Sequence, residues 1–207
     1  MKRLALVATL VLALCQNLYA ERMTLKEYSD LGGDFTLIDH NNQPFQLAKR
    51  GKIVMLFFGY LNCPDICPTT LVEMIEVKQL LGANASKVEF VFVTLDPDRD
   101  STENLKTYLA NFDPAFIGLR GSKEEIAKVA KQYNVLYRSR ELRSALGTTI
   151  DHSAAVYMVD TQAQLRFIFP SKSPSQRYIQ GLEMMLKGIG KDTPLQKGDS
   201  WLQKMMK

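Results

Sequence analysis

The sequence is poor in the residues that usually carry metal or redox chemistry: 207 residues contain only three cysteines and two histidines. An excess of one charge is also missing. With Lys2 and Arg3 set aside, 24 basic residues face 22 acidic ones, a balance of +2. Such a balance indicates neither a nucleic-acid partner nor a polybasic membrane patch. A chain of this length buries a substantial core without help from disulfide bonds.

Long apolar runs are missing except at the N-terminus. Met1–Arg3 is a short basic start, residues 4–15 are almost entirely apolar, and Ala20 is a small residue that follows a few polar ones. This pattern is typical of a secretory signal peptide over residues 1–20. An uncleaved anchor and a lipid attached to Cys15 are the alternatives. We expect an exported protein of the bacterial periplasm, soluble or tethered to the inner membrane by its N-terminus.

The remaining chain alternates apolar strand-like runs with segments of helical periodicity. Continuous apolar runs predict strands covered on both faces, and a period near 3.6 residues predicts helices. We expect strands at 34–39, 44–47, 53–58, 88–95, 116–119, 135–137, 154–159 and 164–169, and a basic loop at 138–147. We expect helices after Pro68 and after the cap residues Asp100, Ser122 and Ser173. The order predicts one α/β domain over residues 21–190, with an N-terminal β-hairpin and a central mixed sheet flanked by helices. Residues 191–207 are expected to be a polar tail.

Cys63 and Cys67 share the turn Cys63-Pro64-Asp65-Ile66-Cys67-Pro68 after the apolar run 53–58. In an oxidising compartment they form a disulfide by default, but a bridge across so short a loop constrains the unfolded chain little. Because Pro68 lacks an N–H group, we expect a tight loop and a helix that begins at Pro68. Both sulfurs then lie at a helix N-terminus, which favours the thiolate. Thiolates bind soft metals and also attack disulfides, and the turn alone does not choose between these roles.

The two histidines differ in their surroundings. His40 lies in a polar turn and is expected to be exposed there. His152 lies at the mouth of the strand 154–159, which in a thioredoxin-like sheet runs beside the strand that delivers the cysteines. Two sulfur ligands and one nitrogen, without a fourth protein ligand, fit copper better than structural zinc. Asp151 is positioned to orient His152, although a plain turn residue is an equal interpretation.

Several sequence segments occur together in an order and spacing that resemble the SCO/SenC family of copper proteins. This family has a thioredoxin-like fold and acts in cytochrome c oxidase assembly. The resemblance covers about residues 33–187. The segments are Phe57-Phe58-Gly59-Tyr60, Cys63 to Pro68, Thr69-Thr70-Leu71, Asp96-Pro97-Asp98-Arg99-Asp100 and Asp151-His152-Ser153-Ala154. Leu61 and Ser101 depart from the family pattern, and neither is an expected ligand.

The resemblance implies that Cys63, Cys67 and His152 bind copper, as Cu(I) or Cu(II), and pass it to the binuclear copper site of cytochrome c oxidase subunit II. It also implies a redox-active Cys63–Cys67 pair, a periplasmic copper donor and a thiol reductant. The leading interpretation is a metallochaperone rather than an enzyme. The main alternative is a thiol–disulfide oxidoreductase that keeps the subunit II cysteines reduced. A peroxidase explains neither the paired cysteines nor His152. Asp96 and Asp98 are expected to be mainly structural.

Overall fold

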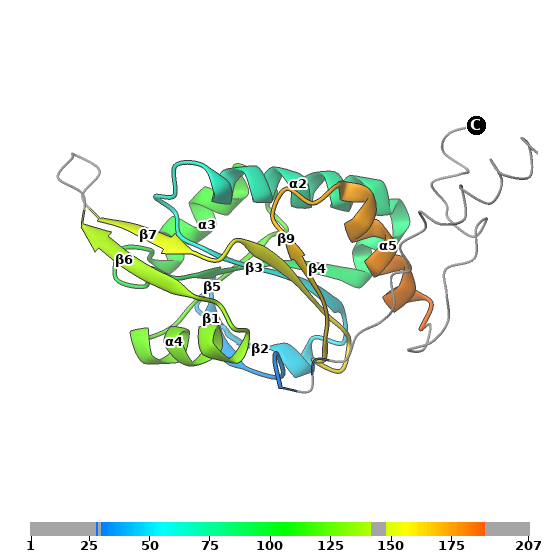
Figure 1. Ribbon diagram of the computed structural model, residues 1–207, viewed down its shortest axis with the longest axis horizontal. Helices are drawn as coiled ribbons and strands as arrows, with labels where there is room; N and C mark the ends of the chain where they lie inside the picture. The colour runs from blue at the N-terminus through cyan, green and yellow to red at the C-terminus, as the bar shows by residue number, and fades with distance from the viewer. Residues whose placement is uncertain (1–27, 29, 142–147, 189–207) are drawn as a thin grey trace, which may run out of the picture. The chain divides into compact units, whose positions relative to one another are not determined.

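The central sheet contains seven strands in the order β2-β1-β5-β4-β3-β8-β9 (Figure 1). The pairs β3–β4 and β4–β5 are parallel, whereas β1–β2, β1–β5, β3–β8 and β8–β9 are antiparallel. The sheet is therefore mixed and begins with a β-hairpin, as predicted. The strands are β1 (Thr36–Asp39), β2 (Pro44–Gln46), β3 (Ile53–Gly59), β4 (Val88–Thr94), β5 (Ile117–Arg120), β8 (Ala155–Val159) and β9 (Leu165–Pro170).

The computed structural model describes residue 28 and residues 30–141 and 148–188. All of them belong to one compact unit, Leu25–Ile189. The predicted signal peptide at 1–20 and the predicted tail at 191–207 lie outside the described residues. Within the described ranges, no helix has the length and hydropathy needed to cross a membrane.

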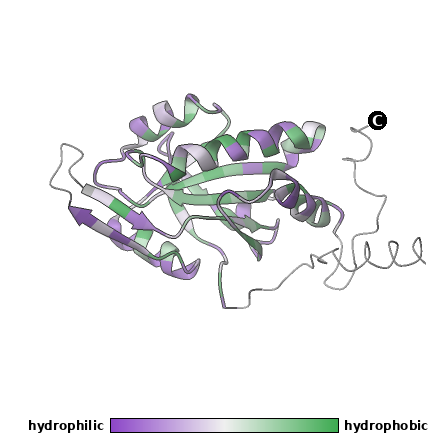
Figure 2. Cartoon of the chain, turned by 45° about the horizontal axis from the view of Figure 1, so that its top comes forward, coloured by the Kyte–Doolittle hydropathy of each residue, from purple (hydrophilic) through white to green (hydrophobic). Residues whose placement is uncertain are grey.

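β3 and β4 form the centre of the core. All seven residues of β3 are buried, as are six of the seven residues of β4. Helices cover both faces of these strands, so the side chains on either face are shielded from solvent. The strand sequences are therefore continuously apolar and do not alternate with polar residues (Figure 2). The parallel register pairs Gly59 with Thr94. The carboxyl ends of β3 and β4 therefore meet at one edge of the sheet, where the cysteine turn begins.

Four helices flank this sheet. α2, α3 and α5 lie on one side of it and α4 lies on the other (Figure 1). Their bounds are α2 (Ile66–Leu81), α3 (Thr102–Ala110), α4 (Lys123–Gln132) and α5 (Ser175–Leu186), and two short 3-10 helices are η1 (Leu47–Lys49) and η2 (Gly82–Lys87). Gly82 caps α2 with a φ of 53°, and Gly188 follows α5 with a φ of 59°. Both glycines have a positive φ, which favours glycine over other residues, and both predicted helix stops are confirmed.

The predicted helix starts are only partly correct. Ser122 and Glu125 form the predicted capping box at the start of α4, each side chain bonding the backbone of the other residue. The cap of α3 is Ser101 rather than Asp100, and its hydroxyl accepts a hydrogen bond from the Asn104 backbone. Ser173 does not cap α5 either, because its hydroxyl donates to a backbone carbonyl before the helix and Pro174 takes the cap position.

A second, two-stranded sheet was not predicted. β6 (Tyr137–Glu141) and β7 (Thr148–His152) form an antiparallel hairpin that projects from one end of the molecule (Figure 1). The sequence predicts a strand at 135–137 and a loop at 138–147 instead. All five residues of β6 are exposed, so the strand carries no apolar alternation that a sequence pattern could detect. The hairpin matters because His152 is the last residue of β7 and not the entrance to β8.

Candidate metal centre

The turn between β3 and α2 carries both cysteines. α2 begins at Ile66, two residues before the predicted start at Pro68. Cys67 therefore lies in the first turn of the helix, while Cys63 lies in the loop ahead of it. The proline is tolerated because N–H groups in the first helical turn have no partner within the helix. The predicted position of both sulfurs near a helix N-terminus is nevertheless confirmed.

The two thiols differ in access. Cys67 is fully buried, and Cys63 is half-buried on the loop. Cys67 Sγ lies directly against Gly59 at the end of β3, where a Cβ atom would be only 2.7 Å from the sulfur. The absence of a side chain at Gly59 is thus what lets the Cys67 thiol sit over the edge of the sheet. Cys67 is part of the core scaffold, whereas Cys63 faces the outside.

His152 reaches the cysteines from the hairpin. Its Nε2 atom lies 3.6 Å from Cys67 Sγ, and its Nδ1 atom lies 3.2 Å from the backbone oxygen of Ser153. A carbonyl oxygen only accepts hydrogen bonds, so Nδ1 carries the proton of the neutral ring and Nε2 keeps its lone pair. The ring also meets Phe57 and Tyr60, with centroid separations of 6.2 and 6.1 Å. The bare nitrogen consequently faces the sulfurs.

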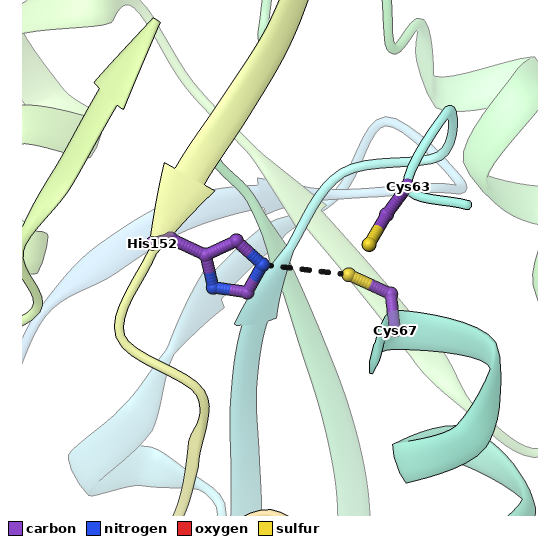
Figure 3. A group of neighbouring side chains, drawn as sticks. All are labelled: Cys63, Cys67 and His152. Atoms are coloured by element: carbon purple, nitrogen blue, oxygen red, sulfur yellow. Dashed lines mark hydrogen bonds between the residues drawn. The ribbon is translucent and has the colours of Figure 1, made fainter. Parts of the chain in front are cut away.

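The three side chains form one cluster at the edge of the sheet. Their ligand atoms all lie within 4.8 Å of one another. Figure 3 shows the imidazole entering from the end of β7 and the two sulfurs from the loop and the start of α2, all three directed at a common point. The structure therefore brings together Cys63, Cys67 and His152 from positions almost ninety residues apart, in the arrangement that the sequence predicts.

The cluster favours one thiolate and one thiol in the absence of metal. The hydrogen bond from the Cys67 thiol is the main cause that lowers the pKa of Cys63 to about 3. Burial opposes this shift, whereas His152 and the backbone N–H groups of Asp65 and Cys67 add to it. The pKa of Cys67 is raised, chiefly because its proton is held in the hydrogen bond to Cys63 and because the group is buried. The helix N-terminus adds to the stabilisation of negative charge on Cys63.

A buried carboxylate supports the cysteine turn from behind. Asp100 is 1% exposed, and its Oδ2 atom accepts hydrogen bonds from the Leu61 backbone at 3.1 Å and from Thr94 Oγ1 at 2.5 Å. Burial raises the pKa of Asp100. The sequence pattern predicts a helix cap at this residue and gives no sign of its contact with the turn. The only available signal was the resemblance, which singled out the segment that ends at Asp100.

Asp151 does not take the role suggested for it. Adjacent residues of a strand point to opposite faces, so the Asp151 side chain turns away from the His152 ring. It is exposed and lies 3.5 Å from Arg140 on the neighbouring strand β6. The partner of the imidazole Nδ1 atom is the carbonyl of Ser153 instead, a contact that residue types do not encode.

The remaining candidates lie outside the cluster. His40 is half-buried rather than exposed as predicted, and its Nδ1 atom accepts a hydrogen bond from a β5 backbone N–H at 3.1 Å. Asp96 forms an ion pair with Arg99, and Asp98 forms one with Lys123. These contacts fit the mainly structural roles that the sequence assigns to the two aspartates.

The donor set favours a soft metal ion. Among the residues that the structure describes, Cys63, Cys67 and His152 are the one group of at least three cysteine, histidine or acidic side chains close enough to hold a metal. Thiolate sulfur and imidazole nitrogen favour copper or zinc over magnesium or calcium. A structural zinc site normally has four protein ligands. In the described part of the chain, this group supplies three.

The mixed sheet, its flanking helices and the dithiol–imidazole cluster define a thioredoxin-like protein equipped for metal or thiol chemistry. The chain belongs to the SCO1/SenC family, whose model matches residues 23–187. An SCO2-like protein of Rickettsia conorii is 37% identical over 149 residues, which cover 70% of this chain and 73% of that relative. The resemblance stated from the sequence motifs is confirmed.

Solved structures of the same family agree with the fold. ScoI of Bradyrhizobium japonicum with copper bound is 36% identical and has a TM-score of 0.68, covering 75% of this chain and 99% of that one. Yeast Sco1 with copper bound is 28% identical with a TM-score of 0.70, covering 79% and 92% of the two chains. These similarities confirm the predicted thioredoxin-like α/β class over the described domain.

Proposed function

We propose that this protein is a copper-binding metallochaperone of cytochrome c oxidase assembly, which delivers copper to the binuclear copper site of oxidase subunit II. The observation that carries the proposal is the convergence of two thiol sulfurs and one imidazole within 4.8 Å. Family membership supports it, because two solved Sco proteins related to this chain contain copper. Cys63, Cys67 and His152 are the proposed ligands.

Copper is the cargo in this proposal. Cys63 offers the more accessible sulfur, and Cys67 offers the second sulfur once its proton is released, because thiol ligands bind metals as thiolates. The bare Nε2 atom of His152 supplies the third donor. Three soft ligands satisfy Cu(I), and Cu(II) needs a further oxygen ligand such as water. The protein's own contribution is to hold these donors at the edge of a rigid sheet with one side open to a partner.

The proposed setting follows from the N-terminal sequence and from the family. We propose export to the bacterial periplasm, with the domain free or tethered by its N-terminus. A periplasmic copper donor loads the site and subunit II receives the ion. A thiol reductant is also required, since a Cys63–Cys67 disulfide has no thiolates left to bind metal.

The test is an anaerobic copper titration of the reduced protein beside His152→Ala, with His40→Ala as the matched control. Removing the third donor is expected to weaken Cu(I) binding at least tenfold, whereas the control keeps the wild-type affinity because His40 lies outside the cluster. Equal affinity in the wild type and His152→Ala would contradict the proposed ligand set. Copper binding that survives complete oxidation of Cys63 and Cys67 would contradict it independently.

A second candidate function is suggested by the unequal exposure of the two thiols. In a thiol–disulfide reductase the accessible Cys63 thiolate attacks a disulfide of subunit II and forms a mixed disulfide. The Cys67 thiolate then attacks Cys63 Sγ and releases the reduced partner. Two electrons have then passed to the partner, and Cys63 and Cys67 are joined by a disulfide. A thiol reductant restores it. Reduction of a subunit II disulfide peptide by both wild type and His152→Ala, with no copper bound by either, would favour this function.

A further inference from the structure

The three proposed ligands come from two different sheets. Cys63 and Cys67 belong to the turn between β3 of the seven-stranded sheet and α2, whereas His152 ends β7 of the separate hairpin. His152 is held near the sulfurs by the short link to β8, which begins at Ala155 and pairs with β3, and by the contacts between the hairpin and the turn. We propose that Tyr60, through a hydroxyl contact with Thr149, is the positioning residue that holds His152 at the dithiol. This inference rests on the proposed copper function.

Tyr60 is built into the core and reaches the hairpin with its hydroxyl. The residue directly follows β3 and is 2% exposed. Its hydroxyl oxygen lies 2.8 Å from Thr149 Oγ1 on β7, a hydrogen-bonding distance. The edge-to-face contact of its ring with the His152 imidazole has a centroid separation of 6.1 Å and an interplanar angle of 83°. One side chain thus touches both the strand that carries His152 and the ring of the ligand itself.

The other restraints on the imidazole leave a role for this contact. The bond from Nδ1 to the Ser153 carbonyl joins neighbouring residues, so it orients the ring but does not fix the hairpin to the turn. Phe57 supplies a ring contact at 6.2 Å but no hydrogen bond to β7. His152 also lines a shallow, open hollow together with Leu136 and Ser153, so the residue is not enclosed on every side. Tyr60 contacts its ring from the core.

The hydroxyl pair is tested with Tyr60→Phe, Thr149→Val and the double variant, each measured by anaerobic Cu(I) titration. Partners that orient metal ligands typically contribute about 10–100-fold to metal affinity, and we expect a loss of about tenfold in each single variant. If the two hydroxyls act as one unit, the double variant loses no more than either single variant. Wild-type affinity in all three would overturn the proposal.

Tyr133→Phe is the matched control. Tyr133 is another fully buried tyrosine, and its hydroxyl donates to the Gly33 carbonyl at 2.9 Å, away from the cluster. We expect this variant to lose stability in denaturant unfolding while keeping the wild-type copper affinity. If Tyr133→Phe and Tyr60→Phe lose copper affinity equally, Tyr60 affects copper binding only through the stability of the fold. That result would overturn its assignment as a positioning residue.

A readout without metal separates this inference from the copper proposal. The chain has only two histidines, so nitrogen-correlated NMR spectra of the reduced, metal-free protein show two imidazole patterns, with His40 as the internal reference. Wild-type His152 is expected to show the Nδ1–H tautomer and cross-relaxation with the Tyr60 ring. The hydroxyl variants are expected to weaken this cross-relaxation and to keep the tautomer, because the Ser153 carbonyl still accepts the Nδ1 proton. If the copper affinity proves independent of His152 while these NMR effects are observed, only the copper site is refuted. An unchanged His152 spectrum in the variants refutes the positioning role.

Discussion

Replacing Gly59 with alanine tests how the core positions a ligand. The added Cβ would lie 2.7 Å from Cys67 Sγ and 2.9 Å from an edge carbon of Phe92. Ordinary nonbonded separations are about 3.5–4.0 Å, so the sulfur contact is short by roughly 1 Å. The backbone of Gly59 is not left-handed, so the variant introduces a steric overlap without backbone strain. The overlap falls on an atom that we propose to bind copper.

The clash can be relieved in two ways, and each has a measurable consequence. If the backbone and Phe92 stay in place, the Cys67 side chain must turn to another rotamer, which removes its sulfur from the cluster. If the sulfur stays, β3 or Phe92 must shift, and overpacking of this kind costs about 1–3 kcal/mol of stability. Metal–ligand distances in a well-formed site lie within about 0.2 Å of their usual values. We therefore expect Gly59→Ala to weaken Cu(I) binding at least tenfold, which corresponds to about 1.4 kcal/mol.

The assay pairs an anaerobic copper titration with chemical denaturation, and Gly118→Ala is the matched control. A Cβ at Gly118 would lie 2.8 Å from Leu109 Cδ1, a comparable overlap, but it touches no proposed ligand. The control is expected to lose stability and keep its copper affinity. If Gly59→Ala binds copper as tightly as the wild type, Gly59 is not what places the Cys67 sulfur, and the steric reasoning is wrong.

Two further predictions concern stability alone. Burial raises the pKa of Asp100 above its ordinary value of 3.8, so its contribution to stability is present below that value and is lost as pH rises through the folded-state pKa. The unfolding free energy of the wild type relative to Asp100→Asn should therefore fall as the pH rises above 3.8, and a rise would contradict the assignment. Ser122→Ala removes one half of the α4 capping box and should cost about 1 kcal/mol in urea unfolding. An unchanged midpoint would mean that the box contributes nothing to the fold.

The parts of the fold that depend on burial were predictable from the sequence. The continuous apolar runs of β3 and β4 are long and covered on both faces, so their pattern reports their position directly. The Ser122 box and the two glycine stops carry equally local signals. The cysteine turn and His152 were also identified, because a thioredoxin-like sheet brings the end of β3 beside the start of β8, and the antiparallel register of these strands bears this out.

The contacts that shape the site were not predictable, because they depend on tertiary neighbours. β6 is exposed along its whole length, so nothing in its sequence distinguishes it from a loop. Asp100 stands one residue before a serine that caps the same helix, and only the fold shows that its carboxylate turns inward to Leu61. The Nδ1 partner of His152 is a backbone carbonyl, which every residue possesses. Residue identity therefore located the proposed ligands but not the contacts that hold them.

The unequal surroundings of the three proposed ligands bear on why such a site suits cargo. A resident structural metal is normally enclosed by four protein ligands. Here Cys67 is fixed in the core, whereas Cys63 and His152 are only partly buried. A partner's ligand can approach on that open side, add to the coordination of the ion and displace Cys63 or His152 before Cys67. The order of release follows from the exposure of the ligands. Cys63→Ser should therefore change the rate of the first step of copper transfer to an accepting peptide, whereas Cys67→Ser should mainly change the rate at which the protein itself loses copper. Equal effects of the two substitutions on both rates, measured by stopped-flow, would contradict this order.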